Sequence, residues 1–222
     1  MSYGIGWAIG VPAVVPILNT AVSFPFMVAA LRRSDLKLAV GRMLLWALTM
    51  GVAATLLSYA YPAQTEELLL RSGDYRREMF TWVLTGRGAE STPAQFIPQQ
   101  AAQAGLFTAL ALATGGVLAM PMGAVLMNYM GHYVGTLAGV SRHPAAIMLA
   151  GWHPWAVIRV ISFVVLGVVL SAPLLSRVFR FHIDWSAARR LLTWSCAGLV
   201  ADIVLKTLLA PAWQRLLIRL LG

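Results

Sequence analysis

The sequence predicts an all-α fold, a polytopic transmembrane helical bundle of about six membrane helices with amphipathic helices at the membrane interface. Its 222 residues are 59% hydrophobic and only 11% charged, whereas ordinary soluble domains carry about 25% charged residues. The mean hydropathy is +0.74. From Ser91 to Ser141 the chain has no Asp, Glu, Lys or Arg. Since apolar segments occur along the whole length, we expect one integral membrane domain, residues 1–222.

The expected membrane helices follow from the length of one crossing. A helix rises about 1.5 Å per residue and the hydrocarbon core is about 30 Å thick, so about 20 apolar residues span it. Applied along the chain, this predicts helices at about 7–31, 38–60, 104–120, 121–140, 156–175 and 191–210. The first contains Pro12, Pro16 and Pro25, so we expect it to be kinked or to begin as an irregular segment.

The one long polar connection is the extramembrane loop 64–103. Its first part, 66–85, mixes charges of both signs with apolar residues, which predicts an amphipathic helix on the bilayer surface. For residues 86–103 we expect an ordered loop. At the other end of the chain, Pro211 is expected to end the last membrane helix, and residues 213–221 to form a short amphipathic tail.

Basic residues gather in two places, residues 32–42 and residues 177–190. Such clusters beside apolar segments orient helices toward the cytoplasm and contact anionic lipids. The net charge of +9 therefore indicates the lipid bilayer, and not nucleic acid, as the partner. Both clusters fall on one side if residues 104–140 form a hairpin, and on opposite sides if they form one kinked helix. The positive-inside bias favours the hairpin and suits a bacterial inner membrane.

Three glycines recur at every fourth residue near the end of the uncharged run: Gly131, Gly135 and Gly139. At that spacing they share one helix face and let a neighbouring backbone approach closely. This predicts a helix-packing interface. The neighbour is either another helix of the same chain or a partner, in a homo-oligomer or another membrane subunit.

His132 lies beside this stripe, one helical turn after Asn128. A histidine within a membrane helix can hydrogen-bond across a helix pair, relay protons in transport, or bind haem iron. We expect the structural hydrogen bond, with the other two roles as alternatives. Haem would need a second axial ligand at a matching depth.

Asp202 and Lys206 are four residues apart in the last membrane helix, so they share a face. An isolated charge at the bilayer centre costs roughly 3 kcal/mol or more, and pairing lowers that cost. The sequence predicts that the two pair with each other, or that they line a substrate path together with Asn128 and His132. Arg159 and Trp155 are expected to contact lipid headgroups.

Motifs for catalysis are missing from the sequence. It has no nucleophile–base pair, glycine-rich phosphate loop, zinc-protease helix or paired acidic motif. The single cysteine, Cys196, lies in an apolar segment, and no Cys/His cluster points to zinc or iron–sulfur. We therefore expect no enzyme activity, no metal and no resident cofactor apart from the haem alternative at His132.

Residues 110–170 contain a paired apolar helix that ends in the turn YVGTLAGVS, residues 133–141. A short segment, 144–151, follows, and then a helix begins at Pro154. This order resembles the core of the Yip1 family of small polytopic membrane proteins, in which the turn usually shows Gly-Gly followed by Gly-Ser. A weaker resemblance is to the SpoIIM-type membrane family. Both resemblances imply an all-helical, non-enzymatic protein of membrane organisation, trafficking or complex assembly.

These observations predict a non-catalytic integral membrane protein, a structural or assembly subunit of a larger membrane complex. The first alternative is a small transporter or channel component that uses Asp202, Lys206 and His132. The second alternative is a haem-binding membrane subunit.

Overall fold

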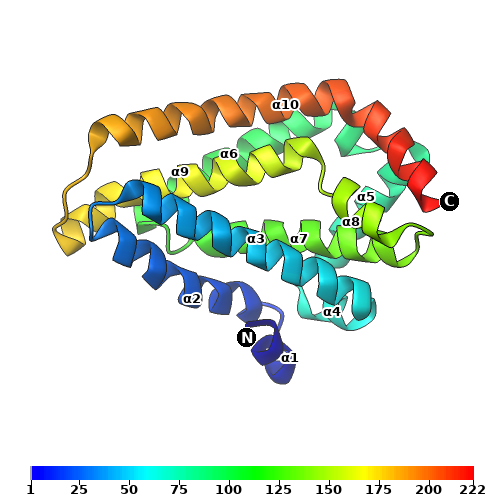
Figure 1. The fold of residues 1–222 in the computed structure, drawn as a ribbon, viewed down its shortest axis with the longest axis horizontal. Coiled ribbons are helices and arrows are strands. Elements are labelled where there is room, and N and C mark those ends of the chain that lie inside the picture. The colour runs from blue at the N-terminus through cyan, green and yellow to red at the C-terminus, as the bar shows by residue number, and fades with distance from the viewer. Residues whose placement is uncertain (1) are drawn as a thin grey trace.

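The computed structural model describes residues 2–222, and over that range it contains helices and turns but no strand. The all-α prediction is confirmed. Figure 1 shows long helices lying side by side, with several of the shorter helices at the end of the molecule where the chain terminates. The elements are α1 (Ser2–Ile9), α2 (Val14–Leu31), α3 (Leu36–Ala60), α4 (Pro62–Leu68), α5 (Ser72–Thr85), η1 (Ala89–Ser91), α6 (Pro93–Thr114), α7 (Ala119–Gly139), α8 (Pro144–Ala150), α9 (Pro154–Phe179) and α10 (Trp185–Leu221).

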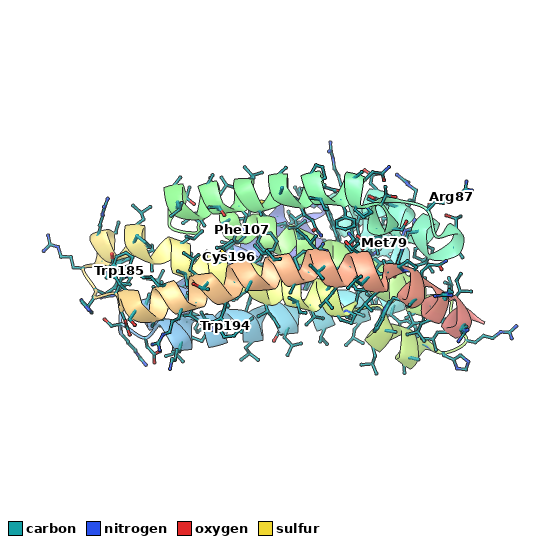
Figure 2. The ribbon with its side chains drawn as sticks, turned by 90° about the horizontal axis from the view of Figure 1, so that it is seen from above. Met79, Arg87, Phe107, Trp185, Trp194 and Cys196 are labelled. Carbon is teal, nitrogen blue, oxygen red and sulfur yellow. The ribbon has the colours of Figure 1, made fainter. Side chains whose placement is uncertain are left out.

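Four of these helices, α2, α3, α9 and α10, are long and apolar enough to cross a membrane. The composition and these four helices are those of a membrane protein. The outer face of α10 shows the surface that lipid requires, because it exposes large apolar side chains such as Trp194, which is 75% exposed, Val200 and Leu208. Figure 2 labels Trp194 and the exposed Cys196 on opposite sides of α10.

The uncharged run forms two helices, α6 and α7, and the chain reverses direction between them (Figure 1). Residues 104–140 are therefore a hairpin and not one kinked helix. The predicted boundary at residues 120 and 121 is wrong by about one turn. Gly115 and Gly116 form the turn, with φ of +60° and +91°, a region that only glycine adopts without strain. Pro121 fits in the first turn of α7, because backbone N–H groups there have no acceptor within the helix and the missing N–H of proline breaks no hydrogen bond.

The predicted loop over 86–103 is wrong from Pro93 onward, because residues 93–103 are the first half of α6. Proline is favoured at the first position of a helix, and Pro93 occupies that position. The amphipathic helix expected within 66–85 is split into α4 and α5. The apolar face of α5 covers protein, since Trp82 and Val83 are fully buried in the cluster that α5 forms with α7 and α10.

Both ends of the chain also differ from the expected boundaries. The first predicted helix is divided at residues 10–13 into α1 and α2. Pro211 does not end α10, which continues to Leu221. The turns after Pro211 are stabilised by packing: Leu217 is fully buried, and the Trp213 indole donates a hydrogen bond of 2.8 Å to the carbonyl oxygen of Ala150. Figure 1 shows the helix bending near this end.

The two basic loops lie at the same end of the molecule (Figure 1). One joins α2 to α3 and the other joins α9 to α10. Their contact is direct, because the guanidinium carbon of Arg32 lies 5.8 Å from the ring centroid of Phe179. This is the arrangement in which a hairpin at residues 104–140 places both basic clusters on one side of a membrane.

Candidate functional site

A cavity of about 210 Å³ lies among α3, α6, α7 and α9, with η1 and α10 at one end. The character of its lining changes from that end to the other. The polar end carries side chains that hydrogen-bond or ionise: Tyr75, Glu78, Glu90, Gln99, Gln100, Gln103, Arg159 and Lys206. Toward the turn between α6 and α7 the lining is apolar, and it includes Met27, Met43, Trp46, Phe107, Met120, Phe163, Val164 and Val168.

The cavity is elongated along α9. Its lining on this helix runs from Ala156 to Ser171, a distance of about 22 Å at 1.5 Å per residue. On the antiparallel α7 it runs from Met130 back to Ala119, or about 17 Å. Phe107 lies in the wall, with its ring centroid 5.0 Å from that of Phe163, and Figure 2 shows it on the inner side of α6.

An ion pair between α9 and α10 borders the polar end. Arg159 donates two hydrogen bonds to Asp202, from Nε to Oδ2 at 2.8 Å and from Nη2 to Oδ1 at 2.9 Å. Asp202 is only 2% exposed. In this bidentate pair the guanidinium and the carboxylate form two parallel hydrogen bonds, which offset much of the cost of burying the two charges. Arg159 is also one of the residues that line the cavity.

A second ion pair joins α10 to η1. Lys206 Nζ lies 2.7 Å from Glu90 Oε1 and 4.3 Å from the ring centroid of Phe96. Burial acts to raise the pKa of the Glu90 carboxyl, but the positive charges of Lys206 and Arg159 outweigh it and leave that pKa below its ordinary value. Glu90 is therefore held ionised beside the cavity.

These contacts correct the predicted pairing of Asp202 with Lys206. Each residue has a partner on another element, Arg159 for Asp202 and Glu90 for Lys206. The i,i+4 rule considers one helix alone, whereas the packed bundle brings in charges that are distant in the sequence. Glu90 was missed because it lies in the segment that the sequence assigned to a loop. The signal available was that Lys206 and Arg159 both needed an acid, and only one was within four residues of either.

Gln100 lines the cavity with buried polar atoms that have no protein partner among the described residues. Both its Oε1 and its Nε2 are buried, and neither forms a hydrogen bond among the described residues. Buried amide groups are normally satisfied, at a cost of about 1–3 kcal/mol when they are not. An unsatisfied donor and acceptor side by side on a cavity wall indicate a position for a polar group of a ligand.

His132 and Asn128 lie away from this cavity, which neither of them lines. The imidazole of His132 lies 3.0 Å from Ser58 Oγ through Nδ1, and its Nε2 is 3.6 Å from Glu66 Oε2. Asn128 Oδ1 accepts a hydrogen bond of 2.7 Å from Tyr3. The predicted polar site of Asn128, His132, Asp202 and Lys206 is thus two separate clusters. The structural hydrogen bond across a helix pair is what His132 makes, to α3.

Two glycines of the stripe contact α3. A Cβ at Gly131 would lie 2.6 Å from the Cβ of Ala54, and a Cβ at Gly135 would collide with the Thr55 carbonyl oxygen. At Gly139, a Cβ would meet nothing within 4 Å. The close approach at Gly131 and Gly135 is therefore between two helices of this chain, α7 and α3.

The predicted headgroup contact of Trp155 and Arg159 is wrong. Trp155 is fully buried and stacks on His153, with ring centroids 4.7 Å apart. Arg159 binds Asp202. The end of α10 covers this region, as the contact between Trp155 and Trp213 shows, with centroids 6.0 Å apart. Tryptophans beside an apolar segment predict an interfacial belt, but this local pattern does not show that another helix will cover them.

Within residues 2–222, no group of three or more His, Cys, Asp or Glu side chains is placed to hold a metal ion. The polar end of the cavity can instead hydrogen-bond a ligand through Gln100 and present charges that are already paired. Comparison of the chain with protein-family models, with curated proteins and with solved structures finds no match. The resemblance to the Yip1 family stays a prediction, and function has to be argued from the site.

Proposed function

We propose that this chain is a multi-pass membrane protein that binds a small amphipathic molecule in the cavity. The observation that carries the proposal is the change of lining along one axis, from Gln100 and the two ion pairs to methionine and aromatic side chains. Ligand sites in proteins are concave and mostly apolar, with a few placed polar groups. The polar end would hold a head group and the apolar end a hydrocarbon portion.

The size of the cavity supports a ligand over a packing defect. Protein interiors are packed as densely as organic crystals, with few voids larger than a water molecule. An unfilled space of this size leaves the side chains that line it without packing partners, which costs stability. A bound molecule that fills the 210 Å³ removes that cost.

For the membrane, we propose about six crossings, with α6 and α7 added to the four apolar helices. The support is that the second half of α6 and all of α7 carry no charged residue. We place the two basic loops, between α2 and α3 and between α9 and α10, on the cytoplasmic face of a bacterial inner membrane, following the positive-inside rule.

The proposal extends the transport alternative that the sequence raised, with different residues. Arg159, Glu90 and Gln100 replace His132 at the site. Binding within the membrane is the step that a carrier of amphipathic molecules needs. The assembly-subunit function remains a prediction, and the glycine stripe lends it less support because Gly131 and Gly135 already pack on α3. The haem function also remains a prediction. His132, the residue on which it depends, does not line the cavity.

The test compares two glycine variants of α7. Gly123 lines the cavity, where a Cβ would meet Phe107 at an ordinary 3.8 Å, so the leucine of Gly123→Leu would occupy the cavity. Gly139→Leu is the matched control, since this glycine is exposed on the same helix. Native mass spectrometry of protein purified in mild detergent should show a bound small molecule on the wild type and on Gly139→Leu but not on Gly123→Leu. A wild type without any added mass, or equal loading of both variants, would contradict the proposal.

A further inference from the structure

We infer that the molecule in the cavity is a lipid with one hydrocarbon chain and an uncharged head that both donates and accepts hydrogen bonds. This inference rests on the proposed function and adds the class of ligand. It follows from three properties of the cavity: its charge, the unsatisfied atoms of Gln100, and its length and width.

The charges at the polar end are already neutralised by protein. Arg159 with Asp202 and Lys206 with Glu90 form two complete pairs, so their four charges sum to zero. The remaining acidic side chain of the lining, Glu78, is exposed. An anionic head would enter the site without a free counter-charge, and a cationic head would find only Glu78, whose charge is screened by solvent. Breaking one of the two buried pairs instead is costly.

The unsatisfied side-chain amide of Gln100 also favours an uncharged head over a charged one. Its unsatisfied Oε1 requires a donor, and its unsatisfied Nε2 requires an acceptor. A hydroxyl or amide head supplies both at once. A carboxylate or phosphodiester supplies acceptors alone, and a quaternary ammonium supplies neither a donor nor an acceptor. The amide thus fits glycerol-like or amide-like heads better than the charged heads of common membrane lipids.

The apolar part of the cavity has the length of one acyl chain. From Arg159 to Ser171 the lining of α9 extends about 18 Å. Half of the hydrocarbon core, the thickness that one leaflet fills with acyl chains, is about 15 Å. The volume of about 210 Å³ is below the range of about 300–1,000 Å³ typical of drug-sized ligands. The cavity therefore admits part of one chain and no second chain, and the rest of a long chain would extend through the open side of the cavity. The flexible side chains of Met27, Met43 and Met120 can adapt to that chain.

The experiment uses probes with a matched sixteen-carbon chain and different heads: 1-monopalmitoylglycerol, palmitate, hexadecyltrimethylammonium and hexadecane. Each is titrated against the full-length protein in mild detergent, and affinity is obtained from the shift of the unfolding temperature with probe concentration. We expect the monoacylglycerol to bind most tightly. The variant Gln100→Leu should weaken its binding about tenfold, the effect of a lost hydrogen-bonding partner, while leaving the affinity for hexadecane unchanged.

The control variant is Gln95→Leu, which changes an exposed glutamine of α6 that does not line the cavity and should bind all four probes as the wild type does. Unchanged hexadecane binding shows that Gln100→Leu is folded. Tighter binding of palmitate or of the ammonium probe, or a monoacylglycerol affinity that Gln100→Leu does not alter, would overturn the inference. In that case the proposed function still stands if Gly123→Leu abolishes binding of every probe, and it fails if Gly123→Leu abolishes none.

Discussion

Arg159 of α9 and Asp202 of α10 are joined by two parallel hydrogen bonds of 2.8 and 2.9 Å, and the carboxylate is almost fully buried. The pair fixes α9 against α10 at the polar end of the cavity. Asp202 also neutralises the charge of Arg159. The guanidinium therefore lines the cavity wall without needing an anionic ligand to balance its charge. The stability of the site should therefore depend on keeping both partners.

Removal of one partner should be more harmful than removal of both. Asp202→Ala leaves the Arg159 charge without its carboxylate, and breaking a buried pair in this way costs about 3–5 kcal/mol. The double variant Arg159→Met with Asp202→Leu should recover most of that loss, because it buries no charge. Chemical unfolding in detergent measures both. A single variant that is no less stable than the double variant would contradict the pairing.

The second pair predicts the reactivity of the two lysines in the chain, Lys37 and Lys206. Lys37 is exposed, whereas Lys206 is 2% exposed and bound to Glu90. An amine-reactive reagent applied to the folded protein should modify Lys37 and spare Lys206, as read by peptide mass spectrometry. The variant Glu90→Ala should increase labelling of Lys206, and Glu78→Ala, at an exposed acid of the cavity edge, serves as the control. Equal labelling of both lysines in the wild type would show that Lys206 is not buried.

The packing of α7 on α3 predicts opposite effects for two glycines of one stripe. Gly135→Ala introduces a Cβ that collides with backbone of α3, and overpacking of this kind costs about 1–3 kcal/mol. Gly139→Ala meets open space and should be neutral or stabilising by up to about 1 kcal/mol, because alanine favours helix over glycine. Thermal unfolding of the two variants checks this, and equal destabilisation by both would place Gly139 in a tight contact as well.

His153 predicts how stability changes with pH. Burial lowers the pKa of this imidazole to about 4, against about 6.5 when the chain is unfolded. The folded protein therefore binds fewer protons, so its stability is complete above about pH 6.5 and decreases by up to about 3 kcal/mol as the pH falls toward 4. His153→Phe keeps an aromatic ring between Trp82 and Trp155 and should reduce this dependence. An unchanged pH profile of unfolding for the variant would show that other groups cause it.

Much of the helical architecture could be predicted from the sequence, because apolar runs of the length of one crossing have few alternatives to helix in a bilayer. The hairpin at residues 104–140 was also favoured by the positions of the basic residues. The boundaries were less predictable. Pro121 looked like the turn, but proline is allowed in a first helical turn, and Gly115 and Gly116 supply the left-handed backbone instead.

The site itself could be predicted only in part. Asp202 and Lys206 stood out as charges within an apolar segment, but their partners lie 43 and 116 residues away along the chain. Pairing over such distances depends on how the helices pack, which no local pattern records. Gln100 carried no signal either, since a glutamine in a polar segment is ordinary. Its importance follows from what surrounds it after folding.

The measurement that tests the central claim most directly is an experimental density map of the protein purified from its own membrane. The account predicts continuous elongated density between α6, α7 and α9, with one end within hydrogen-bonding distance of the Gln100 amide and the other near Ser171. A cavity closed by side chains, or one that holds only separate water molecules along its length, would contradict the claim that this protein binds an amphipathic molecule.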